Sequence, residues 1–147
     1  MLDQNTSAQL KTLLERLEGP IELVATLNDS DKSAKIKELV EEVAALSDLV
    51  TARFDGKNRR APSFGIAKAG EEPRVFFAGL PMGHEFTSLI LALLQTSGYA
   101  PKVSDEVLAN IKSLGVQSNF DVFVSLSCHN CPDVVQALNL IAIYNPG

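Results

Sequence analysis

Hydrophobic positions along the first part of the chain switch between the spacing of helices and that of strands. Leucines recurring every three or four residues predict a helix over 5–17, which Gly19-Pro20 would end. Strand-forming residues then predict a strand over 21–27. A return to helical spacing predicts a second helix over 33–46. The chain therefore opens with a helix, a strand and a helix.

Three further strands and another helix follow. The strands are predicted over 49–54, 62–68 and 74–77, the last two being separated by a turn at 69–72. After a group of chain-breaking residues, a helix is predicted from about residue 84 to residue 96. This part of the chain thus combines a strand-helix-strand unit with a strand-strand-helix unit.

The pattern of the first unit returns near the end of the chain. Beyond a predicted linker at 98–101, Ser104 is placed to cap a short helix. A strand is predicted over 120–126, a turn over 127–131 and a helix over 133–144. The chain therefore ends with a second strand-turn-helix unit.

Composition narrows the class of protein. With 147 residues, of which 46% are hydrophobic, the chain can bury a core as one domain or two small ones. A net charge of -5 argues against a nucleic-acid or anionic-membrane surface, so proteins or small molecules are the expected partners. We see neither a membrane-spanning apolar run nor the opening of a signal peptide, and we expect a cytoplasmic location.

Two cysteines, Cys128 and Cys131, stand where the last helix is predicted to begin. A helix N-terminus stabilises negative charge, so Cys128 is assigned as the attacking thiolate. Cys131 lies one helical turn further on and is assigned as the resolving thiol. Pro132 suits the first helical turn, where its missing N–H is no loss. His129 and Asn130 either tune the thiolate or simply fit the turn.

Metal binding is the main alternative for these cysteines. A zinc site generally uses four ligands, and only Cys128, Cys131, His129 and His84 are available for nomination. A second Cys pair is missing, and a single C-x-x-C after a strand is the redox arrangement. We therefore expect a redox dithiol without a metal or cofactor in this chain, with inert structural thiols as a further alternative.

The two strand-turn-helix units superpose when Leu27 is set on Leu126. The strands and the apolar face of the following helices keep register in this alignment. Asp29 and Lys32 then occupy the positions of the two cysteines. Duplication with loss of one dithiol would leave such a pattern, although any two units of this kind share an apolar pattern.

Three segments, 20–27, 83–89 and 125–140, resemble the N-terminal domain of the flavoprotein subunit of bacterial alkyl hydroperoxide reductase. The resemblance implies an α/β, thioredoxin-like fold class. One complete, cysteine-free thioredoxin fold would be followed by the first strand and helix of a second fold, within which this chain stops. The parts are the first fold over 1–99, a linker and helix over 100–118, and the start of the second fold over 119–147.

The same resemblance implies a disulfide oxidoreductase. Its dithiol would take electrons from the parent's thioredoxin-reductase-like part, which uses FAD and NADH, and pass them to a peroxiredoxin that destroys peroxides. The reductase-like part and the peroxiredoxin are thus the expected partners, and FAD and NADH would bind outside this chain. A non-catalytic docking domain, an inactive fragment and a homodimer that covers the unfinished second fold remain alternatives.

Two further residues take their roles from the resemblance. It places Glu85 near the dithiol, where a carboxylate would disfavour the thiolate and could exchange protons with the leaving sulfur. Alternatively, Glu85 merely complements the dipole at a helix start. Pro62 occupies the place of the cis-proline before the third strand of a thioredoxin-like fold, so a cis bond is predicted. His84 is interpreted as a helix-start residue.

Overall fold

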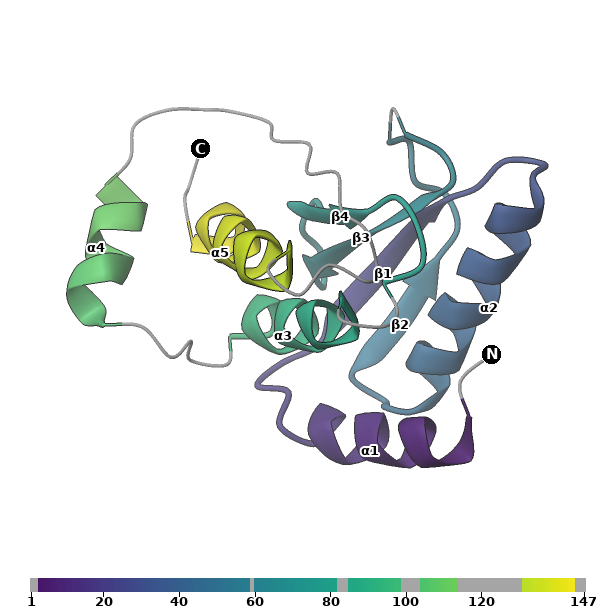
Figure 1. Cartoon of the computed structure of the whole chain (residues 1–147), viewed down its shortest axis with the longest axis horizontal. Helices are drawn as coiled ribbons and strands as arrows, with labels where there is room; N and C mark the ends of the chain where they lie inside the picture. Colours follow the sequence, from purple (N-terminus) through teal and green to yellow (C-terminus); the bar gives the residue numbers. More distant parts are fainter. Residues whose placement is uncertain (1–2, 59, 82–84, 99–103, 114–130, 145–147) are drawn as a thin grey trace.

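A four-stranded mixed sheet forms the centre of the molecule (Figure 1). The computed structural model describes residues 3–58, 60–81, 85–98, 104–113 and 131–144. Within these, the strand order is β2-β1-β3-β4; β1 runs parallel to β2 and antiparallel to β3, which pairs antiparallel with β4. The strands are β1 (Ile21–Thr26), β2 (Val50–Arg53), β3 (Ser63–Lys68) and β4 (Val75–Phe77).

Helices precede, connect and follow these strands. Along the chain, α1 comes before β1, α2 joins β1 to β2, and α3 follows β4, so the predicted order of elements is confirmed. Two more helices come after α3. The helices are α1 (Gln4–Leu14), α2 (Asp31–Ala45), α3 (Phe86–Thr96), α4 (Asp105–Ser113) and α5 (Cys131–Tyr144). None of these helices of the described chain is long and apolar enough to cross a membrane.

The core lies between one face of the sheet and the first three helices. Alternate residues of a strand point to the same face, and Ile21, Leu23 and Ala25 of β1 are all at most 1% exposed. The apolar side chains of α1, α2 and α3 belong to the same buried cluster. Burial of this shared cluster is the main force that holds the helices on the sheet.

The other residues of β1 face away from these helices. Glu22, Val24 and Thr26 alternate with the core positions and point to the opposite face. The chain between β2 and β3 must pass the end of β1, because β1 lies between those strands. Gly56 N–H donates to the Ala25 carbonyl at 3.0 Å, and Asn58 N–H donates to the Thr26 hydroxyl at 3.0 Å. This crossing segment is thus anchored on β1.

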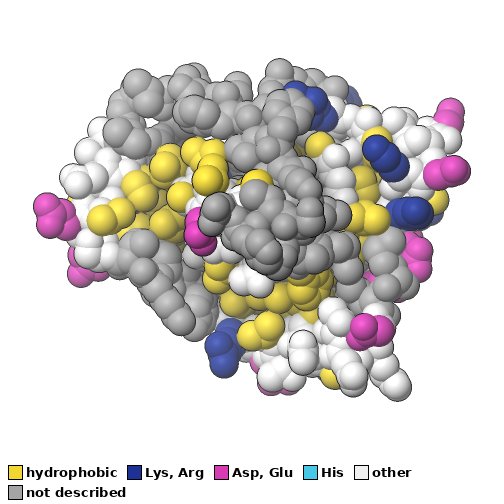
Figure 2. All heavy atoms as spheres, viewed as in Figure 1, with side chains coloured by type: hydrophobic (Ala, Val, Ile, Leu, Met, Phe, Trp, Pro, Cys, Tyr) yellow, Lys and Arg dark blue, Asp and Glu magenta, His cyan; other side chains and the backbone are white. Residues whose placement is uncertain are grey.

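Helix α5 packs on α3 and beside β4. Leu140 is buried, and Ala142 and Ile143 pack against the main core cluster. Other apolar side chains of the helix stay accessible: Val134 is 52% exposed. Figure 2 shows hydrophobic side chains gathered on the left of the view, where α4 and α5 lie in Figure 1. Helix α5 is therefore only partly covered, although it also contacts α4.

The predicted ends of the elements needed correction by a few residues. The first helix stops at Leu14, not at residue 17, because the next N–H groups bond to carbonyls three residues back in tighter turns. Helix α2 begins at Asp31, since the Ser30 hydroxyl caps it by accepting from Ser33 N–H. Helix α5 already begins at Cys131. The predicted strand over 120–126 lies outside the described residues.

Candidate redox site

Cys131 is the first residue of α5 and is half-buried. It takes part in a disulfide bond. The sequence contains one other cysteine, Cys128, which lies outside the described residues together with His129 and Asn130. Pro132 falls in the first turn of the helix, as predicted. A disulfide at the opening of a helix is the oxidised form expected of a C-x-x-C redox centre.

Glu85 lies immediately before α3 and is 3% exposed. Its side chain makes no capping hydrogen bond to the helix backbone. Oε1 instead accepts a hydrogen bond from the Ser88 hydroxyl at 3.1 Å. A buried carboxylate is costly unless it has polar partners, so Ser88 compensates part of the cost of burying it. Glu85 therefore occupies the N-cap position of α3 without capping it by a hydrogen bond.

A second hydrogen bond joins this pair to the helix that Cys131 opens. Nε2 of Gln136, in α5, donates to the Ser88 hydroxyl oxygen at 3.3 Å. Hydrogen bonds thus connect three side chains, from Gln136 to Ser88 to Glu85, across the interface of α3 and α5. Sequence reasoning had named Glu85 as a candidate and had named neither Ser88 nor Gln136. Ser88 could have been found from its spacing of one helical turn, but Gln136 could not.

The corresponding turn of the first fold carries polar groups instead of thiols. Asp29 and Lys32, at the two positions aligned with the cysteines, are both exposed. Between β1 and α2, Asn28 donates from Nδ2 to the Ala61 carbonyl at 3.1 Å. The Ala61–Pro62 peptide bond is cis, which confirms that prediction. This hydrogen bond therefore joins the turn before α2 to the loop before β3.

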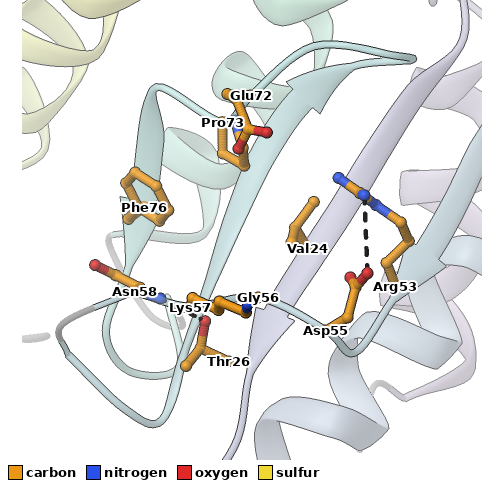
Figure 3. A pocket seen from close by; sticks show the side chains of 10 residues that line it. All are labelled: Val24, Thr26, Arg53, Asp55, Gly56, Lys57, Asn58, Glu72, Pro73 and Phe76. Atoms are coloured by element: carbon orange, nitrogen blue, oxygen red, sulfur yellow. Dashed lines mark hydrogen bonds and ion pairs between the residues drawn. The ribbon is translucent and has the colours of Figure 1, made fainter.

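A hollow in the described chain lies elsewhere, on the face of the sheet opposite to the core (Figure 3). Its volume is about 570 Å³, and none of the predicted site residues lines it. Val24 and Phe76 supply apolar walls, and Arg53 and Asp55 form a loose ion pair with 4.0 Å between Nη1 and Oδ2. Both signs of charge line this hollow, so it has no single electrostatic preference for a ligand.

The described residues also bear on the metal-binding alternative for the cysteines. Among the described residues, no group of three or more His, Cys, Asp or Glu side chains is placed to hold a metal ion. His84 and His129, which were nominated as ligands, lie outside those residues.

Comparison with known sequences gives strong matches over nearly the whole chain. The chain is 53% identical, over 146 residues, to the F subunit of alkyl hydroperoxide reductase from Pseudomonas putida, and 53% identical, over 147 residues, to that from Escherichia coli K12. Each match covers 99% of this chain and 28% of the relative, so the chain spans little more than a quarter of these proteins. A search against protein-family models gives no match.

Solved structures share the fold. The NTD_N/C domain of the alkylhydroperoxide reductase AhpF from Enterococcus faecalis superposes with a TM-score of 0.83 at 27% identity, over 99% of this chain and 76% of that one. A protein disulfide oxidoreductase from Aeropyrum pernix gives a TM-score of 0.78 at 19% identity, over 96% and 68% of the two chains. The fold is accordingly thioredoxin-like, as expected. By sequence and by fold, the chain belongs to the family of the N-terminal domain of the alkyl hydroperoxide reductase AhpF.

Proposed function

We propose that this chain is a dithiol-disulfide relay, which carries electrons from a reductase to a partner protein. The observation that carries the proposal is the disulfide of Cys131 at the opening of α5, in a chain about half identical to part of a reductase. Helix N-termini lower the pKa of thiols, and thiolates are the attacking species in disulfide exchange. The position therefore suits a reactive thiol better than an inert one.

The proposed reaction has two steps. The Cys128 thiolate attacks a disulfide of the partner, forms a mixed disulfide and releases one partner thiolate. The Cys131 thiolate then attacks the Cys128 sulfur, which closes the Cys128–Cys131 disulfide and releases the second partner thiolate. Two electrons pass to the partner, and two protons convert its thiolates to thiols. The reverse exchange with a reduced donor dithiol restores the starting state.

We assign the ends of this relay from the family. The donor is a thioredoxin-reductase-like part of the parent protein, which would hold FAD and use NADH, and the acceptor is a peroxiredoxin that reduces alkyl hydroperoxides. The reaction would take place in the cytoplasm. In this assignment, residues 1–99 form the cysteine-free first fold, 100–118 connect, and 119–147 begin the fold that carries the dithiol.

Glu85 is proposed to modulate the dithiol. Its buried carboxylate is connected through Ser88 to the helix that begins at Cys131. Negative charge near a thiolate raises its energy, and a nearby carboxyl group can also accept or return the proton of a leaving thiol. The glutamate would thus influence which of the two sulfurs leaves during exchange, and how easily the disulfide is reduced.

Alkylation followed by mass spectrometry tests the relay. Separate samples are alkylated at three stages: the oxidised chain, the chain after reduction by a dithiol donor, and the reduced chain after incubation with an oxidised peroxiredoxin. We expect no label on the first sample, two labels on the second and none on the third, because the dithiol has then closed to a disulfide before the alkylating reagent is added. A chain whose two thiols stay fully labelled in the presence of oxidised partners would refute the proposal.

Replacement of both cysteines by serine separates the relay from a docking function. The Cys128→Ser, Cys131→Ser double variant should bind the peroxiredoxin while transferring no electrons. Binding is measured by isothermal titration calorimetry and transfer by the label count on the peroxiredoxin. Transfer that survives the double substitution would contradict the assignment of these thiols.

A further inference from the structure

We infer that Ser88 and Gln136 are positioning residues, which hold the Glu85 carboxylate toward the redox helix and so help to set the reduction equilibrium of the dithiol. The inference rests on the proposed function, because the dithiol must exchange for its equilibrium to be set. Both residues are inferred to act through the glutamate, to which hydrogen bonds connect them.

The direction of the two hydrogen bonds is fixed by chemistry. A serine hydroxyl has a single proton, and Ser88 gives it to Oε1 of Glu85. The serine oxygen is then available as an acceptor, and the Gln136 amide fills that role. The Gln136 amide therefore donates to Ser88, and Ser88 donates to the Glu85 carboxylate. Replacement of Ser88 by alanine removes both bonds at once.

Burial makes this arrangement rigid. Glu85 and Ser88 are 3% and 1% exposed, so water has little access to replace a lost partner. Apolar contacts between α3 and α5 bring the helices together but are non-directional. The Gln136 bond adds a directional link between the carboxylate and the helix that Cys131 opens.

The consequence follows from Coulomb repulsion. A carboxylate facing α5 disfavours a thiolate at the start of that helix, and therefore disfavours the reduced form of the centre. If the carboxylate loses its donor, it is free to turn away from α5, and the reduced form gains stability. Loss of Ser88 or Gln136 should thus shift the equilibrium in the same direction as loss of the Glu85 charge, by a smaller factor.

Equilibration with glutathione tests this inference. The reaction consumes one oxidised glutathione per dithiol and yields one protein disulfide and two reduced glutathiones, and alkylation with mass spectrometry counts each protein form. We expect Glu85→Gln to favour the dithiol by about tenfold, and Ser88→Ala and Gln136→Met by about two- to fivefold. Ser88→Thr, which keeps the hydroxyl, should stay close to the wild type.

A double variant separates positioning from a general structural effect. In the Glu85→Gln background, Ser88→Ala should cause no further shift, because the charge that it positions is already gone. Two control variants perturb the same helices at positions outside the hydrogen-bonded group of Glu85, Ser88 and Gln136. Thr96→Val in α3 and Asn139→Leu in α5 each remove a buried polar atom that has no hydrogen-bond partner, and both should leave the equilibrium unchanged.

Three outcomes would overturn the inference. Equal shifts in Ser88→Ala and Thr96→Val would assign the effect to helix packing. A Ser88→Ala shift that persists without the Glu85 charge would show that Ser88 does not act through the glutamate. A wild-type chain that never exchanges with glutathione would remove the proposed function, and the inference with it. Thermal unfolding of every variant checks that the compared proteins are folded.

Discussion

Asn28 and Ser33 bond to each other twice across the first turn of α2. The backbone N–H of Asn28 donates to the Ser33 hydroxyl oxygen at 2.7 Å, and that hydroxyl donates to Oδ1 of Asn28 at 2.8 Å. These residues flank Asp29 and Lys32, the positions that align with the cysteines of the second unit. The cysteine-free fold therefore closes its turn with hydrogen bonds at the place where the other unit carries its thiols.

Loss of the Ser33 hydroxyl should destabilise the first fold. Ser33 is 4% exposed, and Ser33→Ala would leave the backbone N–H of Asn28 without its hydrogen-bond acceptor. We expect a decrease of about 1–3 kcal/mol in the free energy of unfolding, measured by urea denaturation. Ser113→Ala is the matched control, because that exposed hydroxyl bonds only to its own helix in the described contacts. Equal stability of the two variants would contradict this prediction.

Gly65 should not tolerate a side chain. A Cβ atom on this residue of β3 would lie 2.6 Å from Cβ of Pro73 and 2.8 Å from Cε1 of Phe76. Gly65→Ala is therefore expected to cost about 1–3 kcal/mol through overpacking and to lower the thermal unfolding midpoint. Gly79→Ala provides the control, since nothing lies within 4 Å of its added Cβ. A Gly65→Ala variant as stable as the control would show that the segment around Pro73 moves away freely.

Asp3 should make the stability of α1 depend on acid pH. Its Oδ1 accepts from the Thr6 N–H at 2.6 Å, and this bond holds the pKa of the carboxyl below the usual value of 3.8. Because the folded-state pKa is the lower one, the contribution is complete above the unfolded value and is lost as the pH falls through the folded value. The stability advantage of the wild type over Asp3→Asn should therefore shrink as the pH is lowered from about 6 through this region, by circular dichroism. A constant difference would argue against an ionised cap.

The ion pair between Arg53 and Glu22 should contribute little. Nε of Arg53 lies 2.9 Å from Oε2 of Glu22 on the neighbouring strand, but the arginine side chain is 42% exposed. Solvent screening reduces such pairs to about 0.2–1 kcal/mol of coupling, which a double-mutant cycle with Arg53→Met and Glu22→Gln would measure. The coupling should fall in high salt. A coupling well above that range would indicate a less solvated face than the exposure suggests.

Local periodicity was sufficient to predict the elements, whereas contacts between distant segments were not predictable. The alternation in β1 and the helical spacing in α2 report directly which side chains are buried, so their type and order were correct. The predicted start of α2 was two residues late, because the hydrogen bond of the Ser30 cap, and not the apolar spacing, decides where the helix begins. The contact from Gln136 to Ser88 spans 48 residues and depends on how two helices pack. No local pattern contains that information.

The segment that crosses the end of β1 has a consequence for the order of folding. Both of its anchors, the Ala25 carbonyl and the Thr26 hydroxyl, belong to a strand that must already be in position to accept those bonds. Since ordering a connection costs entropy before its distant contacts compensate, we expect this crossing to form after the pairing of β1 with β2. Strand β3 would then join a two-stranded template at the β1 edge.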